Sequence, residues 1–393
     1  MAMSANKKLF ETARKLPKSE LHLHLDGSLP ASFIVKRARV RGVKLMPPLT
    51  AKENSSDTEA AHNLRTAIHR MKLDSIKTGN KQSAGGNWPV FDFCNQFLQT
   101  TEELDEAVTL LCSNLVEENV RYAEIRFCPE LHTLEGLDSC KVVSTVCTAF
   151  QKFSSKYAYD DTRRFHGGII LCALRSKPLQ HAIDMANLAS KYMSKGVVGF
   201  DIAGDEGNYP LENFTEALDV CLNANIPVTV HAGEWLSENC SYTGGSRKNL
   251  QFALRHKAIK RIGHGIELVS CQNLLEECER KNVTVECCIT SNIREDKVPH
   301  FEDHPIRAMF DNSIPVCLNS DNLLLSGSVD NVASSSNEIV RLVSHLSFSW
   351  QDVRKVLLHG IEGRFARNVE HEWVEQYIKD VDKVLADVDQ ASR

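Results

Sequence analysis

Short apolar runs rich in β-branched residues recur along the chain, and longer segments with helical periodicity separate them. The expected strands lie at residues 21–25, 121–127, 167–174, 197–203, 226–230, 260–265, 283–288 and 314–320. Intervening segments such as 103–119 and 176–194 carry apolar residues at the spacing of amphipathic helices. Strands that alternate with helices predict a parallel sheet with helical crossovers. Eight such units predict an α/β fold, a closed (β/α)₈ barrel of the TIM type.

Two regions depart from this alternation. Residues 46–90 follow the first expected strand, are polar, and carry the sequence NKQSAGGN at 80–87. In a barrel this insertion would lie over the C-terminal mouth, where it could act as a lid, although a solvated loop with one or two helices fits the pattern equally well. Residues 350–393 have the pattern of amphipathic helices that cover the outside of a barrel. We therefore expect one domain over residues 1–393, with extra helices at the mouth and at the C-terminus.

The composition limits the class of partner. The 393 residues carry a formal net charge of -5 and have a pI of about 6.3, which argues against nucleic acid or an anionic membrane as the main partner. No apolar run approaches the length of a transmembrane helix, and the N-terminal segment lacks the apolar stretch of a signal peptide. The 13 cysteines include no C-x-x-C pair, so we expect reduced thiols in a cytoplasmic protein. With no interface signal in the sequence, we expect a monomer.

Polar residues at the ends of the expected strands are the candidates for chemistry. His22 and His24 share one face of the first strand, because side chains two apart on a strand point the same way. His231 directly follows the fifth strand, His264 ends the sixth, and Asp321 follows the last. In a barrel of this type the active site forms at these strand ends. Each residue alone is more often an ordinary polar residue, but the set suits Zn²⁺ with an open position for water.

Two further residues lie near these ends. Glu234 is three positions beyond His231, so its carboxyl group is expected near a metal without binding it. A desolvated pocket could keep Glu234 protonated and able to donate a proton to a ring nitrogen, whereas a solvent-exposed loop glutamate would have no such role. Gly204, in DIAGDE, could let the backbone approach a ligand closely, or could simply form a turn.

Several segments together resemble the adenosine deaminase family. ELHLHLDGS (20–28), VVGFDIAGDEG (197–207), HAGE (231–234), IGHG (262–265) and NSD (319–321) occur in the order and spacing of that family. RYAEIRFCP (121–129) and VECCITSN (285–292) also look like its second and seventh strands. The resemblance covers about residues 16–340. It implies a zinc-bearing barrel that hydrolyses the 6-amino group of adenosine, and of 2′-deoxyadenosine, to give inosine or its deoxy form plus ammonia.

The resemblance also implies a role for each residue at a matching position. The implied zinc ligands are His22, His24, His231 and Asp321. Glu234 would protonate purine N1, and His264 would assist deprotonation of the zinc-bound water and steady the hydroxide. Gly204 would offer its backbone N–H to purine N3, and Asp26 would hydrogen-bond the ribose 5′-hydroxyl.

Positions 26 and 322 bear on the substrate. Members that act on adenosine resemble this chain in having Asp at position 26, where the adenine branch tends to have Glu and the N6-methyl-AMP branch Asn. A carboxylate there would also repel a 5′-phosphate, so we expect a purine nucleoside as the small-molecule partner. Asn322 and Leu323 stand where the family has Asp-Pro, and Ile289 where it usually has Pro. Asn322 can still donate to purine N7, but loss of a charge-assisted contact would lower kcat/KM by roughly 10- to 100-fold.

Other functions stay open at this point. The enzyme could act on adenine or N6-methyl-AMP, belong elsewhere in the wider amidohydrolase group, or be a purine-binding relative whose turnover Asn322 weakens. The second type of zinc deaminase is excluded, because its H-x-E…P-C-x-x-C signature is missing.

Overall fold

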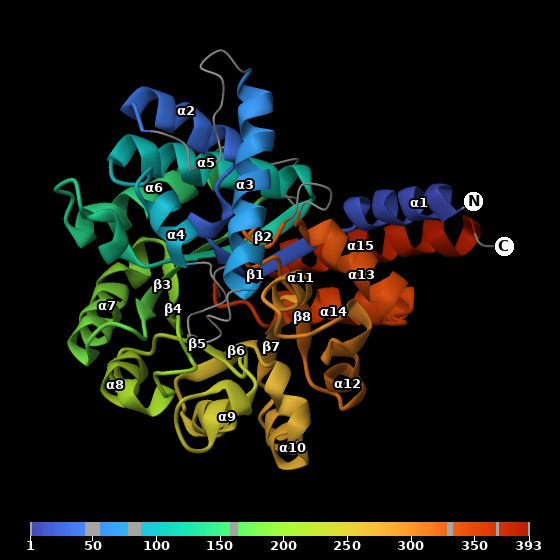
Figure 1. Ribbon diagram of the computed structural model, residues 1–393. Helices are drawn as coiled ribbons and strands as arrows, with labels where there is room; N and C mark the ends of the chain where they lie inside the picture. The colour runs from blue at the N-terminus through green and yellow to red at the C-terminus, as the bar shows by residue number, and fades with distance from the viewer. Residues whose placement is uncertain are drawn as a thin grey trace.

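The computed structural model describes residues 2–43, 56–77, 88–157, 164–327, 333–366 and 369–391. Eight parallel strands stand side by side in chain order at the centre of the molecule, with helices around them (Figure 1). The strands are β1 (Lys18–His24), β2 (Val120–Phe127), β3 (His166–Leu174), β4 (Val197–Ala203), β5 (Val228–Ala232), β6 (Ile259–His264), β7 (Thr284–Cys287) and β8 (Val316–Leu318). This order, without crossovers between distant strands, confirms the predicted (β/α)₈ TIM barrel.

The ring of strands has a gap between β1 and β8, and the residues that follow β8 bridge it. The side-chain oxygen of Asn319 accepts from the Leu21 N–H at 2.8 Å. The backbone of Asp321 then pairs with β1 on both sides: its N–H donates to His22 O at 3.0 Å, and its carbonyl accepts from His24 N–H at 2.8 Å. The barrel is nearly closed at this seam, and the chain segments that form it are almost 300 residues apart (21 and 319, separation 298).

Most of the helices cover the outside of the sheet. Their bounds are α1 (Ala2–Lys15), α2 (Ala31–Arg41), α3 (Asp57–Lys77), α4 (Trp88–Asn95), α5 (Thr101–Glu117), α6 (Ser139–Lys156), α7 (Leu179–Tyr192), α8 (Thr215–Asn223), α9 (Gly245–Arg255), α10 (Gln272–Lys281), α11 (Ile289–Arg294), α12 (Ile306–Asp311), α13 (Ser335–His345), α14 (Trp350–Glu362) and α15 (His371–Ala391). Local signals set some of these ends. Thr100 and Glu103 form a reciprocal capping box at the start of α5, and Ser349 does the same with Asp352 at α14.

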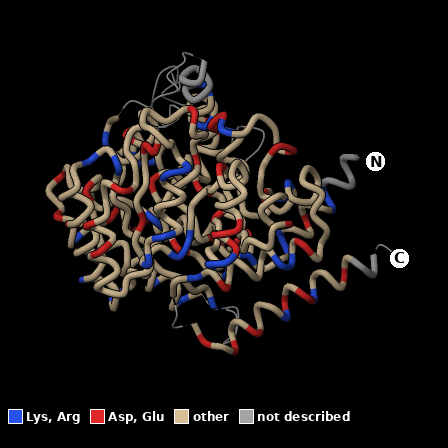
Figure 2. The backbone as a smooth tube through the Cα atoms, turned by 90° about the horizontal axis from the view of Figure 1, so that it is seen from below, with Lys and Arg blue, Asp and Glu red and all other residues tan. Residues whose placement is uncertain are grey.

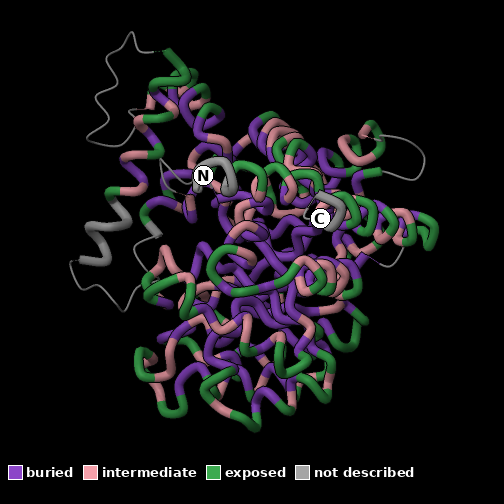
Figure 3. Tube along the Cα trace, turned by 90° about the vertical axis from the view of Figure 1, so that its right-hand side faces the viewer, coloured by how far each residue is buried: buried purple, intermediate pink, exposed green. Residues whose placement is uncertain are grey.

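The C-terminal helices lie where the sequence predicts them. Helix α14 packs on the outside of β8 and β1, and α15 lies beside α1 (Figure 1). Tyr377 of α15 is buried, and its hydroxyl donates to the Pro17 carbonyl just before β1 at 3.1 Å. Figure 3 shows buried residues concentrated in the strands and on the inward faces of the helices, as expected for one apolar core around the barrel.

Part of the polar insertion 46–90 is helical. Helix α3 packs against α2, and α4 lies at the barrel mouth, where Phe91 lines the central cavity. The segment 80–87 lies outside the described residues. The structure therefore places α4 over the mouth, and a closing motion of this region stays a prediction.

All 13 cysteines are free in this structure, and ten of them are buried. Lys and Arg are interspersed with Asp and Glu over the face that Figure 2 shows. Within the described ranges, no helix has the length and apolar character needed to span a membrane.

Candidate active site

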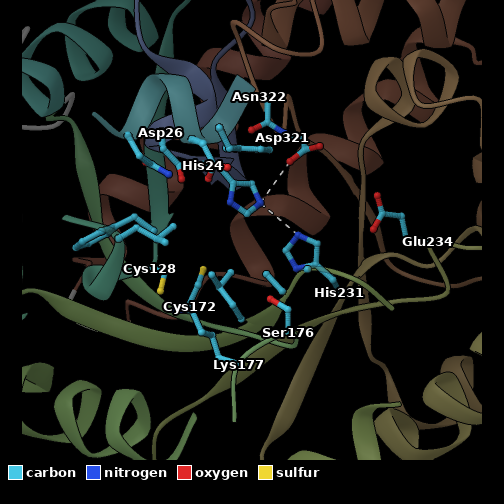
Figure 4. A pocket seen from close by; sticks show the side chains of 18 of the residues that line it. His24, Asp26, Cys128, Cys172, Ser176, Lys177, His231, Glu234, Asp321 and Asn322 are labelled. Atoms are coloured by element: carbon cyan, nitrogen blue, oxygen red, sulfur yellow. Dashed lines mark hydrogen bonds and ion pairs between the residues drawn. The ribbon is translucent and has the colours of Figure 1, made fainter. Parts of the chain in front are cut away.

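Three imidazoles and one carboxylate converge at the C-terminal end of the barrel. Figure 4 shows His24, His231 and Asp321 of this set. His22 and His24 come from β1, His231 from β5, and Asp321 from the segment after β8. His24 Nε2 lies 3.2 Å from His231 Nε2, and Asp321 Oδ1 lies 3.4 Å from His24 Nε2 and 3.5 Å from His22 Nε2. Nitrogen and oxygen lone pairs this close together repel each other unless they share a proton or bind the same cation. Their mixed nitrogen and oxygen character is that of a zinc site.

The imidazole tautomers also fit a metal. His22 Nδ1 lies 2.8 Å from Glu286 Oε2, and His231 Nδ1 lies 3.1 Å from Asp201 Oδ2. Each carboxylate accepts the Nδ1 proton and so leaves the Nε2 lone pair turned toward the other donors. His22 Nε2 is fully buried and has no hydrogen-bond partner, which is costly unless a ligand fills the place. The four residues therefore fit a divalent cation.

The backbone at Asp321 and at Gly263 lies in close contact with this cluster. Asp321 adopts φ +58°, a conformation rare for a non-glycine residue, because both of its backbone polar groups pair with β1. Its Oδ2 atom accepts from Ser291 Oγ at 2.6 Å, which leaves Oδ1 for the cluster. A Cβ at Gly263 would lie 2.8 Å from the His22 ring, so only glycine lets β6 pass this close.

A buried charge network supports the cluster from inside the barrel. Arg126 bridges Asp201 at 3.0 Å and Glu286 at 2.9 Å, while Arg261 bridges Glu286 and Glu124, each at 2.6 Å. Burial alone would raise the pKa of Glu286, but the two guanidinium groups hold that pKa well below its ordinary value. Glu286 therefore stays ionised and able to orient His22.

His264 and Glu234 face each other beside the four donors. His264 Nε2 lies 3.9 Å from Glu234 Oε1, and burial lowers the pKa of His264 to about 4. The expectation that desolvation keeps Glu234 protonated is wrong for this ligand-free structure. Burial does raise the pKa of Glu234, but the nearby His264 and Lys297 side chains lower it by more, so the pKa lies below its ordinary value.

A second buried carboxylate fixes the loop that carries Glu234. Glu206 Oε1 accepts from the Gly233 N–H at 2.8 Å, and Oε2 accepts from the N–H groups of Glu234 and Trp235 at 3.0 and 3.2 Å. Asn249 Nδ2 donates to the same Oε1 atom at 2.8 Å. The position of Glu234 is thus set by a residue of the DIAGDEG segment, and not by its own neighbours alone.

A cavity of about 340 Å³ opens in front of the cluster, within the range of small-molecule sites. Asp26, Gly204 and Asn322 line it, as do His24, His231, Glu234, His264 and Asp321. In Figure 4, Glu234 and Asp26 lie on opposite sides of the histidines. Gly204 has φ +100°, a conformation that favours glycine. Burial raises the pKa of Asp26 to about 6, against hydrogen bonds that lower it, including one from the Gly27 N–H at 3.0 Å.

Asn322 is packed against the backbone. A Cβ at Gly27 would lie 1.6 Å from Asn322 Oδ1, and this buried oxygen has no hydrogen-bond partner. The side chain is therefore held in the cavity wall by close packing and not by a polar contact of its oxygen.

The structure brings all nine residues singled out from the sequence to one end of the barrel: His22, His24, Asp26, Gly204, His231, Glu234, His264, Asp321 and Asn322. Sequence reasoning missed the residues that orient them, namely Asp201, Glu206, Glu286, Ser291 and Asn292. A signal exists for Asp201 and Glu286, because a carboxylate inside an otherwise apolar strand is costly unless it is paired.

Comparison with known proteins agrees with this geometry. The family model described as adenosine deaminase matches residues 17–381. The chain belongs to the adenosine deaminase family. An adenosine deaminase of Clostridium kluyveri is 30% identical over 353 residues, which cover 89% of this chain and 90% of that protein. Members of this family are hydrolytic deaminases, so the protein is an enzyme of that class.

Two solved structures share the fold. A crystal structure of an Arabidopsis N6-mAMP deaminase has a TM-score of 0.74 and 22% identity, and the match covers 95% of this chain and 99% of that one. The crystal structure of an adenine deaminase from Arthrobacter aurescens has a TM-score of 0.75 and 20% identity, covering 94% and 99%. The names of these neighbours give different purines, so the shared fold alone does not define the substrate.

Proposed function

We propose that the enzyme removes the 6-amino group of adenosine, and of 2′-deoxyadenosine, to give the inosine product and ammonia. The observation that carries this substrate is the Asp26 carboxylate in the wall of the cavity, opposite Glu234 (Figure 4). A purine nucleoside can place its base beside Glu234 and its 5′-hydroxyl beside Asp26. Adenine lacks the sugar that Asp26 would bind, and a 5′-phosphate would meet a like charge.

We infer that Zn²⁺ is the resident metal, held by His22, His24, His231 and Asp321. When bound, such an ion lowers the pKa of a water molecule enough to make it a nucleophile near neutral pH. Burial keeps the pKa of His24 well below its ordinary value, so this imidazole is neutral and available as a ligand.

Glu234 is the proton donor in this proposal. Attack at C6 moves electron density onto purine N1, and a positioned acid contributes about 10²–10⁴-fold to the rate of such a step. In the empty cavity the pKa of Glu234 is low. A bound purine excludes the remaining water from the carboxyl group and shifts the pKa upward, which favours the proton-donating form. Because Glu206 fixes the Glu234 backbone, the carboxyl group needs little reorganisation to reach N1.

The remaining contacts orient the base and the sugar. Gly204 presents its backbone to the cavity for purine N3, and Asn322 donates its amide N–H to N7. All of these groups come from one chain, so we propose that the monomer is the working unit.

The test is an ultraviolet assay of zinc-loaded protein with adenosine, adenine and N6-methyl-AMP in parallel. We expect turnover of adenosine well above that of the other two. Faster turnover of adenine or of N6-methyl-AMP would replace adenosine with that substrate. If none is converted although zinc is bound, the protein is a purine-binding relative and the proposal is wrong.

A further inference from the structure

A chain of three hydrogen bonds leads from a peptide N–H to His264. We propose that Asn292 and His304 are positioning residues that hold His264 as the tautomer with its proton on Nε2. This inference deepens the proposed function, because in that tautomer His264 donates a hydrogen bond to the attacking oxygen and cannot take a proton from it. Nε2 of His264 would therefore donate a hydrogen bond, whereas Nε2 of a histidine that binds a metal offers a lone pair.

The direction of the chain is fixed at its far end. The backbone N–H of Ile306 lies 3.2 Å from His304 Nδ1. A peptide N–H can only donate, so Nδ1 must be the acceptor nitrogen. His304 is 2% exposed, and burial lowers its pKa to about 3, so the ring is neutral. Its single ring proton is therefore on Nε2.

The proton positions then follow one after another. His304 Nε2 lies 3.1 Å from Asn292 Oδ1 and donates to it. This contact fixes the amide orientation, so Asn292 Nδ2 faces His264 Nδ1, at 3.1 Å. An amide NH₂ can only donate, and His264 Nδ1 must accept. The proton of neutral His264 is left on Nε2, the nitrogen that lies toward Glu234. Asn292 is 0% and His264 1% exposed, so bulk water does not compete for these contacts.

The barrel uses the opposite arrangement for two of the proposed ligands. Glu286 and Asp201 accept protons from Nδ1 of His22 and His231 and leave Nε2 of each ring with a lone pair. A carboxylate that accepts from Nδ1 leaves a lone pair on Nε2 for a metal. The Asn292 amide, which donates to Nδ1 of His264, instead leaves the proton on Nε2. A fixed N–H aimed at developing negative charge stabilises a transition state without reorganisation.

Asn292→Asp is the sharpest variant, because it keeps the shape of the side chain but leaves only acceptor atoms. We expect the carboxylate to draw the His264 proton to Nδ1 and to remove the Nε2–H donor. Nitrogen NMR of ring-labelled histidines in zinc-loaded protein measures the tautomer directly, with His264→Gln to assign the signal. We expect kcat for adenosine to fall about 100-fold or more, with zinc content unchanged and KM within about threefold.

His304 offers a matched pair of control variants. His304→Gln keeps a donor that can reach Asn292 Oδ1, and we expect it to preserve the His264 signal and most of kcat. His304→Leu removes that donor, lets the amide turn, and should give a mixed tautomer and a lower kcat.

The tautomer and the substrate are tested separately. A His264 proton on Nδ1 in the unmodified protein overturns the inference even if adenosine is converted, and so does an Asn292→Asp enzyme with unchanged tautomer and kcat. A proton on Nε2 in a protein that does not convert adenosine supports the hydrogen-bond chain and overturns the proposed function instead.

Discussion

In the proposed function, single side chains in the cavity wall set how well a purine is held. Asn322 is the clearest case, since its oxygen packs against Gly27 and its nitrogen is the group left for the base. Asp has the same shape as Asn, so the packing constraint allows the exchange. The chemical difference is confined to the contact with N7.

We expect Asn322→Asp to raise kcat/KM for adenosine by about 10- to 100-fold, because a carboxyl group that shares its proton with the acceptor N7 makes a stronger hydrogen bond than a neutral amide N–H does, by about 1–3 kcal/mol. Steady-state kinetics measure the change, and Asn322→Ala should lower kcat/KM. A neutral or harmful effect of the Asp variant would show that Asn322 is adapted to this cavity.

Asp26 provides a prediction about selectivity. Asp26→Asn removes a negative charge from the sugar end of the cavity. Adenosine should lose a charge-assisted hydrogen bond and about 10- to 100-fold in kcat/KM, whereas a 5′-nucleotide no longer meets a like charge. The ratio of the two kcat/KM values, for adenosine and N6-methyl-AMP, should move toward the nucleotide. An unchanged ratio would place the 5′-group elsewhere.

Strand β7 connects the proposed metal ligands to the buried charge network of the barrel. Glu286 contacts His22 of β1, Arg126 of β2 and Arg261 of β6 through its two oxygens. Thr229 of β5 also donates to it, at 2.8 Å. One residue therefore holds four strands in register beneath the site.

We expect Glu286→Gln to destabilise the protein by about 3–5 kcal/mol, because two buried guanidinium groups lose a charge partner. Zinc affinity should also fall by about 10- to 100-fold, because His22 loses the carboxylate that orients it. Glu124→Gln is the matched control: Glu124 pairs with Arg261 but contacts none of the proposed ligands. It should lower stability and leave zinc affinity unchanged. Equal losses of affinity in both variants would contradict the role of Glu286.

Strand positions and the residues at strand ends follow from local pattern, which is why the barrel and the His and Asp residues at its mouth could be predicted. Asp26 and Asn322 are predicted through the family resemblance instead. The hydrogen-bond partners could not be predicted. Asn292, His304 and His264 lie in separate segments of the chain. No periodicity in the sequence indicates that α11 places the Asn292 amide beside His264 at the end of β6. The low pKa of Glu234 likewise depends on the nearby Lys297, a through-space effect that sequence spacing does not contain.

Across the whole molecule, buried neutral histidines predict sensitivity to acid. Burial lowers the pKa of His132 and His264 to about 4 and that of His304 to about 3. Below pH 6.5 these histidines bind protons in the unfolded chain but stay neutral in the folded protein. The free energy of unfolding therefore falls as the pH falls. Glu20 and Asp26 act in the opposite direction, because burial raises their pKa values to about 7 and about 6.

His132 isolates the acid effect because it lies outside the active-site cluster, packed beside Phe127. With a folded pKa of about 4, its contribution to unfolding free energy should decline by about 3 kcal/mol between pH 6.5 and pH 4. Denaturant unfolding of His132→Leu should therefore show a shallower loss of stability with acid than the unmodified protein. Parallel pH curves for the two proteins would show that His132 is not the titrating group.

The seam between β1 and β8 has a consequence for how the protein is made. Two proposed ligands lie on the first strand, and a third lies beyond the last strand, where the backbone ladder is reduced to a single bridge at Leu23 and Asp321. A nascent chain on the ribosome cannot assemble this set until residue 321 has emerged, so the proposed ion would bind only to a finished barrel. If bound by these residues, the proposed ion would link β1 to the segment that follows β8. Amide hydrogen exchange in β1 and β8 should accordingly slow more on zinc binding than exchange in β3 and β4, on the far side of the ring.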